Sequence, residues 1–174
     1  MKRLKLWALA LLFGMGQSQA QELPNTAKIR VDNNNIANIY SNVSCVDPNN
    51  KNVIHAAANG TGLSPWNKGP REGMPLAEGS PKRYSEYRVP ANVPTVIEVS
   101  VERELYQARN WCNERSILFI PEASHNYEIW ATIDVDKKSC QLIGRELAVF
   151  NNQVMMRPIP NAKLTSLCSE VINP

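Results

Sequence analysis

The stretch that decides the fold runs from Cys112 to Cys140. Its central part reads Ser116-Ile-Leu-Phe-Ile120, Pro121-Glu-Ala-Ser-His-Asn126, Tyr127-Glu-Ile-Trp-Ala-Thr-Ile-Asp-Val135. The first segment is a short apolar run, the second contains turn-forming residues, and the third places an apolar residue at every second position. Two such segments joined by a turn are typical of paired β-strands. We therefore predict a β-hairpin with one cysteine beyond each end.

The segment after this hairpin extends the same pattern. Residues 139–149 place Cys140 and Leu142 on the inward face, and the alternation changes face near Gly144. A glycine at such a change indicates a β-bulge. Three sequential strands with short turns predict an antiparallel meander.

Alternating apolar and polar residues predict further strands in the N-terminal half of the chain. They cover residues 25–32, 36–44, 84–89 and 95–101, with a strand or short helical turn at 53–58. In the segment that begins at Thr95, apolar residues alternate with Glu98 and Ser100. We expect one face of this strand to be buried and the other to be solvated.

Residues 46–83 form a long segment rich in glycine and proline, which leaves little room for regular structure. Loops of this length within a compact domain are often functional or disordered. We therefore place the main binding surface here and extend it to the outward face of the hairpin. The candidate interaction residues are Trp66, Lys68, Arg71, Met74 and Trp130.

The C-terminal segment has a different spacing. Asn161 can cap a helix, and the apolar residues that follow recur at i, i+3, i+4 and i+7. These residues are Leu164, Leu167, Cys168 and Val171. The spacing predicts a short C-terminal helix.

The chain begins with features of an export signal. Three basic residues precede an apolar core at 6–16, and Ser18-Gln19-Ala20 fits a small-residue cleavage site. We expect a signal peptide over residues 1–20, a single domain over 21–174, and a periplasmic or secreted location. The apolar core is shorter than the roughly 20 residues that span a bilayer. We therefore expect no membrane span.

The charge balance argues against nucleic-acid binding. The signal segment holds three of the 19 basic residues and none of the 16 acidic ones, so 16 of each remain after its removal. A neutral domain has no overall field that would attract nucleic acid or an anionic membrane.

The four cysteines indicate two disulfides, because export exposes them to an oxidising compartment. Three connectivities are open. We prefer Cys112–Cys140 with Cys45–Cys168, since a hairpin returns its flanking cysteines to the same end of the sheet. Metal ligation is the competing interpretation, but no C-x-x-C spacing supports it.

Residues able to carry catalysis lack the partners that catalysis requires. Ser64 lies in Gly62-Leu-Ser-Pro-Trp66, which departs from the elbow of serine hydrolases at its fifth position. His55 and His125 have no partner acid fixed by spacing, so we interpret both as structural or solvated residues. Tyr127 follows Pro121 as in the corner of two-sheet proteins, where a tyrosine hydroxyl bonds to the turn backbone.

Two carboxylate pairs have the spacing of neighbours on one face of a strand: Glu102 with Glu104, and Asp134 with Asp136. Such pairs bind hard cations or divide acid and base roles, although solvated strand ends are the commoner interpretation. The pair Met155-Met156 indicates core or edge packing, with weak copper(I) binding as the alternative. We predict no enzymatic activity, no cofactor and no metal.

Several short motifs resemble a family of small exported proteobacterial proteins, many of them lipoproteins, that have no assigned function. The resemblance covers roughly residues 27–149. It rests on Gly73-Met-Pro75, on Tyr84-Ser-Glu-Tyr-Arg-Val-Pro-Ala91 with Pro94, on Cys112 and Cys140, and on Phe119-Ile-Pro-Glu-Ala-Ser-His-Asn-Tyr-Glu-Ile129. This chain differs at Ser124, where glycine is usual in the family, and lacks the lipidated cysteine. The resemblance implies a periplasmic β-sandwich and supplies no activity.

These observations predict a mainly β protein. The expected fold is an antiparallel β-sandwich, of the immunoglobulin or transthyretin type, with about seven or eight strands, a long loop and a C-terminal helix. The expected function is a non-enzymatic periplasmic binding or interaction module whose partner is another envelope protein. The alternatives are an inhibitor or immunity protein of the envelope, and a hydrolase that uses carboxylates.

Overall fold

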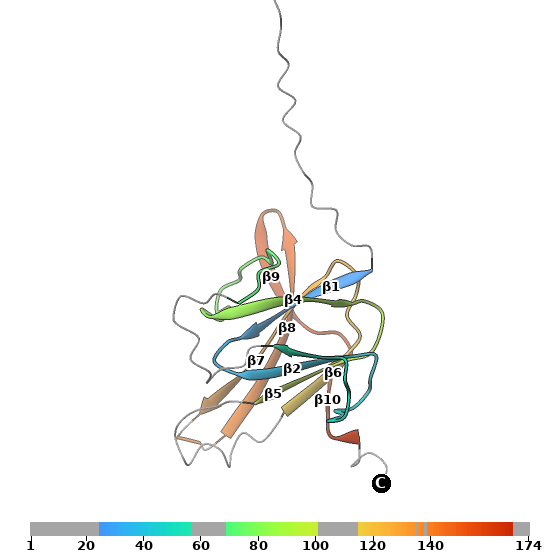
Figure 1. The fold of residues 1–174 in the computed structure, drawn as a ribbon. Helices are drawn as coiled ribbons and strands as arrows, with labels where there is room; N and C mark the ends of the chain where they lie inside the picture. Colours follow the sequence, from blue (N-terminus) through green and yellow to red (C-terminus); the bar gives the residue numbers. More distant parts are fainter. Residues whose placement is uncertain (1–24, 57–68, 101–114, 135, 138, 169–174) are drawn as a thin grey trace, which may run out of the picture.

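The computed structural model describes residues 25–56, 69–100, 115–134, 136–137 and 139–168 of this chain. These residues are mainly β. The strands are β1 Thr26–Asp32, β2 Ile36–Ser41, β3 Val53–Ala56, β4 Tyr84–Pro90, β5 Thr95–Ser100, β6 Arg115–Phe119, β7 Asn126–Asp134, β8 Ser139–Phe150, β9 Gln153–Pro158 and β10 Lys163–Thr165 (Figure 1).

The strands form two five-stranded sheets, which we call sheet A and sheet B. Sheet A has the order β4-β1-β7-β8-β9, and sheet B has the order β10-β6-β5-β2-β3. Every strand pair is antiparallel except β1 with β7, which run parallel. The wholly antiparallel sheet predicted from the sequence is therefore wrong at this pair, because β1 lies between two strands that run in opposite directions.

One apolar cluster fills the space between the two sheets. Sheet A contributes Ile29 and Ile129, and sheet B contributes Ile39 and Ile97, all fully buried. Full burial of such a side chain contributes roughly 1.5–3 kcal/mol before the entropic cost of ordering. The shared core confirms the two-sheet architecture that the alternating strands predict.

The predicted hairpin from residue 116 to 135 is wrong, because β6 belongs to sheet B and β7 belongs to sheet A. Residues 120–125 instead carry the chain across the core, and we call them the arch. The rings of Phe119 and Tyr127 meet inside it, 5.0 Å apart. The backbone N–H of Glu122 donates to the Tyr127 hydroxyl at 2.9 Å, which confirms the predicted tyrosine corner.

The meander is confirmed only from β7 to β8, and the bulge predicted near Gly144 is absent. The register between these strands is continuous from Asn126 opposite Leu147 to Asp134 opposite Ser139. A Cβ atom on Gly144 would lie 2.9 Å from Cδ1 of Ile117 in the other sheet. Glycine occurs here because the two sheets approach closely, and not because the strand changes face.

The outer face of sheet B is covered, so the wet face predicted for β5 is wrong. Val96 is fully buried and Glu98 is 8% exposed. Val96 packs in a second apolar cluster with Tyr40, Val46 and Leu118. The carboxylate of Glu98 accepts hydrogen bonds from the Tyr40 hydroxyl and the Asn38 amide, both at 2.9 Å.

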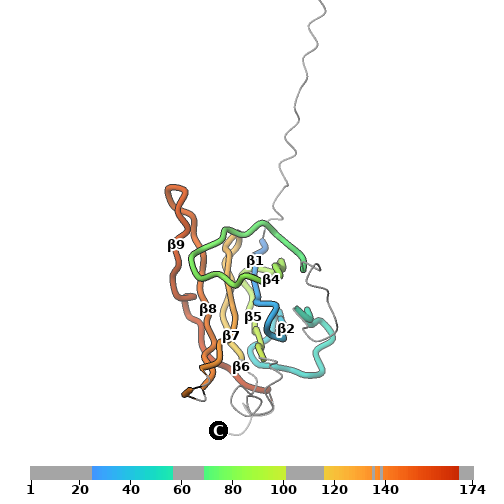
Figure 2. Tube along the Cα trace, turned by 90° about the vertical axis from the view of Figure 1, so that its left-hand side faces the viewer, coloured from blue at the N-terminus to red at the C-terminus, as the bar shows by residue number. Residues whose placement is uncertain are grey.

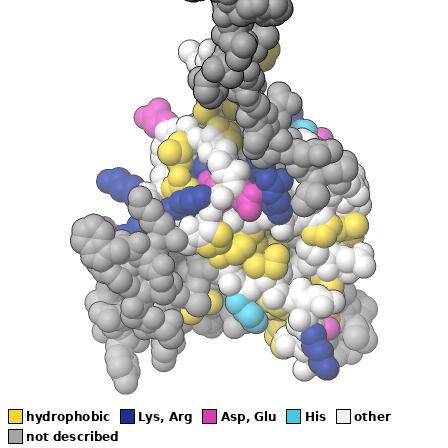
Figure 3. All heavy atoms as spheres, turned by 45° about the horizontal axis from the view of Figure 1, so that its top comes forward, with side chains coloured by type: hydrophobic (Ala, Val, Ile, Leu, Met, Phe, Trp, Pro, Cys, Tyr) yellow, Lys and Arg dark blue, Asp and Glu magenta, His cyan; other side chains and the backbone are white. Residues whose placement is uncertain are grey.

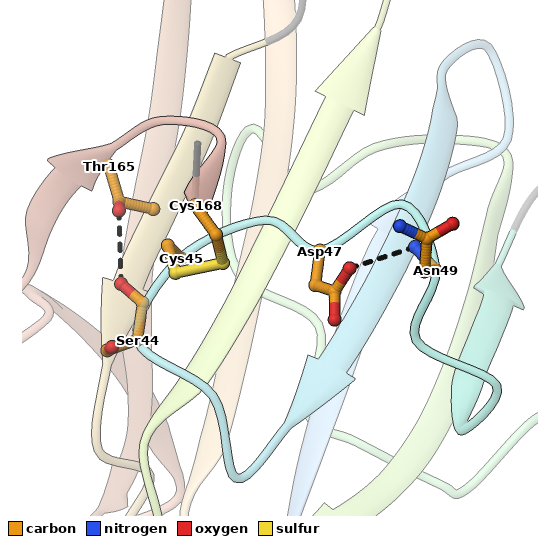
Figure 4. The surroundings of a disulfide bond; sticks show 6 residues. All are labelled: Ser44, Cys45, Asp47, Asn49, Thr165 and Cys168. Carbon is orange, nitrogen blue, oxygen red and sulfur yellow. Dashed lines mark hydrogen bonds between the residues drawn. A yellow bond between two sulfur atoms is a disulfide. The ribbon is translucent and has the colours of Figure 1, made fainter. Parts of the chain in front are cut away.

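The segments around Cys45 and Cys168, which cover the outer face of sheet B, are joined by a disulfide (Figure 4). This bond confirms the predicted pair Cys45–Cys168. The backbone N–H of Val46 donates to Ser166, and that of Cys168 donates back to Val46. The hydroxyl of Thr165 donates to the Ser44 carbonyl at 3.1 Å. Cys112 lies outside the described residues, so its pairing with Cys140 stays a prediction.

The C-terminal helix is not found up to residue 168, because Lys163–Thr165 form β10 and pair with β6. The helical spacing of Leu164 and Leu167 misled the prediction, since Leu164 is 66% exposed. Pairing with the edge of β6 satisfies the backbone hydrogen bonds of these residues, whereas an exposed helix of this length is only marginally stable in water. Val171 and the signal segment lie outside the described residues.

Candidate functional site

The hairpin of β8 and β9 is the most apolar exposed feature of the described residues. It lies at the edge of sheet A and extends beyond the neighbouring strands (Figures 1 and 2). The exposed fractions are 59% for Val149, 63% for Phe150, 58% for Met155 and 44% for Met156. Grouped apolar side chains on a surface mark interaction sites far more often than scattered ones do.

The turn of this hairpin determines which backbone groups of β9 face outward. Asn151 and Asn152 have φ of 49° and 62°, as a two-residue type I′ turn requires. In such a hairpin the closing pair, Phe150 with Gln153, exchanges both backbone hydrogen bonds. Residues 153, 155 and 157 therefore bond to β8, while residues 154, 156 and 158 direct their backbone groups away from it.

The proline of β9 agrees with this assignment. Pro158 occupies one of the outward positions, where its missing N–H costs no bond to β8. The N–H and C=O groups of Val154 and Met156 have no partner among the described residues. The structure therefore presents a short sheet edge that carries two outward N–H donors.

The apolar side chains divide between the two faces of the hairpin. Phe150 and Met155 lie on one face as diagonal neighbours, since Met155 is opposite Ala148. Val149 and Met156 lie on the other face. Because Met155 and Met156 point to opposite sides, they do not converge on one metal ion, and the edge-packing interpretation fits their positions.

The outer face of sheet A carries a row of buried charges that sequence reasoning missed. In register across β4, β1, β7 and β8, the row consists of Glu86, Arg30, Glu128 and Arg145. Arg30 is fully buried and donates to Glu86 at 2.7 and 3.0 Å and to Glu128. Arg145 donates to Glu128 at 2.8 Å. Each carboxylate thus faces a guanidinium.

Residues 70–80, which we call the strap, close over this row. Arg30 donates to the carbonyls of Met74 and Pro75 at 2.9 and 3.0 Å. The Ser80 hydroxyl donates to Glu128 at 2.6 Å. Figure 2 shows this green segment passing over sheet A. The buried charges hold the strap, so the row is better suited to structure than to ligand binding.

The structure describes three of the predicted interaction residues, Arg71, Met74 and Trp130. Met74, which belongs to the strap, is 6% exposed, and Trp130 is 9% exposed, with the Arg145 guanidinium 4.9 Å above its ring. The exposure predicted for these two residues is therefore not found. Arg71 is exposed and stacks on Tyr84 at 3.6 Å. Trp66 and Lys68 lie outside the described residues.

His125 belongs to a second group of charges, between the arch and the base of the β8–β9 hairpin. Its Nδ1 lies 2.8 Å from Oε1 of Glu146, which is 1% exposed, and its Nε2 lies 3.5 Å from Glu122. Arg157 donates twice to Glu146, at 2.8 and 3.0 Å. The hydrogen bonds and the charge of Glu146 raise the pKa of Arg157. These contacts engage both imidazole nitrogens and anchor β9.

A pocket of about 310 Å³ lies beside the arch. Its floor includes Phe119 and Tyr127, and Glu122 and Lys163 lie at its margin. Burial raises the pKa of Tyr127, despite the hydrogen bond from Glu122. The pocket does not include His125, Asp134 or Asp136.

The other catalytic candidates among the described residues are Asp134, Asp136 and His55. Asp134 pairs with Lys137 at 2.9 Å, and Asp136 is exposed in the turn after β7. His55 contacts the amide oxygen of Asn38 on an exposed face of β3. Glu102, Glu104 and Ser64 lie outside the described residues. Over the described ranges, no group of three or more His, Cys, Asp or Glu side chains has an arrangement that could hold a metal ion.

Comparison with known proteins finds no family model, curated protein or solved structure that matches this chain. The part of the chain that the structure describes contains no helix long and apolar enough to cross a membrane. On the face shown in Figure 3, basic and acidic side chains lie among apolar ones instead of gathering by sign.

Proposed function

We propose that this protein is a non-enzymatic interaction module of the periplasm, and that the β8–β9 hairpin is its interaction surface. The observation that carries the proposal is the group of exposed apolar side chains on this hairpin: Val149, Phe150, Met155 and Met156. Methionine adapts its shape to a partner surface at low cost, and apolar aromatic residues supply large contact areas. The partner is another protein of the cell envelope.

The structure moves this proposal away from the loop that sequence reasoning favours. The strap, which is a described part of that loop, is committed to the buried charges beneath it. The hairpin, in contrast, leaves its four large apolar side chains exposed. An exported location agrees with the N-terminal segment and with the disulfide Cys45–Cys168, which an oxidising compartment favours.

The proposal also includes the second disulfide, between Cys112 and Cys140. Peptide mapping by mass spectrometry without reduction tests it directly. We expect one fragment that links these two cysteines. A free thiol at Cys112 would contradict this part of the proposal while leaving the interaction surface untouched.

A photo-crosslinking amino acid tests the surface in the native host. Placed at residue 150, it is expected to trap a discrete envelope protein, and placed at the exposed Lys82 it is expected to trap none. The trapped protein is then purified, and its affinity for Phe150→Ser and for the control Lys82→Ser is compared with wild type. Equal affinity of all three proteins would overturn this placement of the site.

A further inference from the structure

We propose that β9 pairs edge to edge with β9 of a second copy of this chain, which joins the two copies of sheet A into one continuous sheet. This inference rests on the proposal that the β8–β9 hairpin is the interaction surface, and it specifies how the edge of that surface is used. An exposed strand edge is a template for pairing with another strand. Here the edge is also complementary to itself.

The backbone groups select an antiparallel register in which Val154 lies opposite Met156 of the second copy. Both residues direct their N–H and C=O groups outward, as the type I′ turn requires. In this register the N–H of Val154 donates to the carbonyl of Met156 in the second copy, and the N–H of that Met156 donates back. The two-fold axis repeats the exchange, so every outward N–H of both strands is satisfied.

The two neighbouring registers of this strand pair fit the backbone of β9 less well. A shift in one direction places Pro158, which has no N–H, opposite Val154 and loses a hydrogen bond. A shift in the other direction brings Asn152 into the ladder, although its φ of 62° belongs to the turn. The sequence of β9 thus favours one pairing, as a specific interface requires.

Side chains and charge fit the same register. Met155, which is 58% exposed, lies opposite Met155 of the second copy, so the two apolar side chains cover each other. Gln153 lies opposite Arg157, the single charged residue of β9. Like charges directly opposite each other would be destabilising, and this register avoids them.

A second copy is preferred over an unrelated strand because the edge is complementary to itself and its residues 153–156 carry none of the usual protection against self-pairing. Natural edges are protected by prolines, bulges, inward-pointing charges or other charged side chains, lysine above all. In β9 the one charge, Arg157, is held by Glu146 at the base of the hairpin, at 2.8 Å, and the register with β8 has no bulge. Proline ends the edge after Met156, which limits the pairing to one strand of defined length.

A cysteine pair tests the register. Because residue 155 bonds to β8, its contact across the axis is a non-hydrogen-bonded pair with Cα atoms about 4.5 Å apart, within the range that disulfides span. We expect Met155→Cys to form a covalent dimer on mild oxidation, seen on a non-reducing gel. The matched control is Gln153→Cys, which faces Arg157 of the second copy and is expected to form no covalent dimer on the same gel. Absence of the Met155→Cys dimer, or equal dimer from both variants, would overturn the inference.

Sedimentation equilibrium of the full chain tests the backbone contacts. Met156→Pro removes one outward N–H and keeps the bonds between β8 and β9, whereas Met156→Ala keeps the N–H and shortens the side chain. We expect wild type to dimerise, and Met156→Pro to weaken dimerisation by about tenfold or more, because the two-fold axis doubles the loss. Met156→Ala is expected to have a smaller effect. A wild type that stays monomeric, or a proline effect no larger than the alanine effect, contradicts the pairing.

The outcomes separate this inference from the proposed function. If Phe150→Ser weakens partner binding while wild type does not dimerise, the hairpin is the interaction surface and the self-pairing is wrong. If Phe150→Ser leaves partner binding intact while Met155→Cys forms its dimer, the self-pairing stands and the proposed function fails. Crosslinking of Met155→Cys to another protein in place of itself would assign the edge to that protein.

Discussion

At the scale of single residues, Arg30 shows how a fully buried charge is accommodated. Its guanidinium donates to two carboxylates, Glu86 and Glu128, and to two strap carbonyls. A buried ion pair adds little net stability, but removal of one partner leaves the other charge desolvated and uncompensated. Removal of Arg30 is therefore expected to destabilise the fold by much more than its ion pairs contribute to stability.

Arg30→Met is expected to lower the free energy of unfolding by about 3–5 kcal/mol, because it strands Glu86 and Glu128 in a buried site. Urea unfolding followed by tryptophan fluorescence measures the loss. Lys82→Met, at an exposed position, serves as the control and is expected to change stability by less than about 0.5 kcal/mol. A loss of stability in Arg30→Met as small as that of the control would show that the row of charges is not buried as described.

The carboxyl of Glu86 gives a prediction for pH. Burial raises its pKa, but the hydrogen bonds from Arg30 and the strap outweigh burial, so its pKa lies below the ordinary value of 4.5. A carboxyl with a lowered folded-state pKa stabilises the fold above its unfolded-state pKa, and this contribution is lost as pH falls through the folded value. We therefore expect stability to decline with acidification below about pH 4.5.

Glu86→Gln separates this contribution from others. Asp32, whose pKa is raised chiefly by burial, changes stability with the opposite sign over the acid range. We expect the variant to be less stable than wild type at neutral pH, and the difference to shrink as pH falls. Urea midpoints measured at several acid pH values test this, and a constant difference would refute the assignment.

At the scale of elements, β8 links the core to the proposed interaction surface. Its first half faces the other sheet, and its second half extends beyond the core to form the hairpin with β9. Gly144 lies between these halves, where β8 approaches Ile117 of β6. Close approach at this point anchors the hairpin to the sandwich.

Gly144→Ala is expected to cost about 1–3 kcal/mol, since the new Cβ lies 2.9 Å from Cδ1 of Ile117 and 3.2 Å from Cδ1 of Ile159. Ile117→Val removes the nearer of these atoms. A double-mutant cycle by urea unfolding should therefore show that Gly144→Ala costs less when Ile117→Val is present. Strict additivity would mean that the two residues do not touch.

At the scale of the whole molecule, the disulfide joins segments at opposite ends of the described chain. Cys45 and Cys168 are 123 residues apart, and the segments beside them cover sheet B. A crosslink that closes a long loop restricts the unfolded chain strongly. It also holds Val46 and Leu167 over the second apolar cluster.

Replacement of both cysteines by serine, Cys45→Ser with Cys168→Ser, is expected to cost about 2–5 kcal/mol. Thermal and urea unfolding measure the change, with the exposed Leu164→Ser as a control from the same C-terminal segment. Because the β8–β9 hairpin belongs to sheet A, the dimer formed by Met155→Cys should persist in this background. A loss of that dimer together with the disulfide would contradict the separation of the two sheets.

The sequence by itself determined several of the strands and which of their residues share a face, but it did not predict β9 or β10. Alternation predicted β1, β2, β4 and β5, and the spacing from Pro121 to Tyr127 predicted the tyrosine corner. The pair Cys45–Cys168 was also predicted. The strands and the corner are local in the chain, so a linear pattern contains them. The cysteine pair was chosen among three connectivities on the basis of a hairpin that the structure does not contain.

Only the tertiary structure decided which strands pair and what covers each face. The same alternation and turn suit a hairpin or an arch between sheets, and the arch sends β6 and β7 into different sheets. Trp130 and Met74 were predicted interaction residues, but both are buried, Trp130 beneath Arg145 and Met74 within the strap. A period of two specifies the two faces of a strand, while contacts between residues distant in the chain decide whether a face meets protein or water.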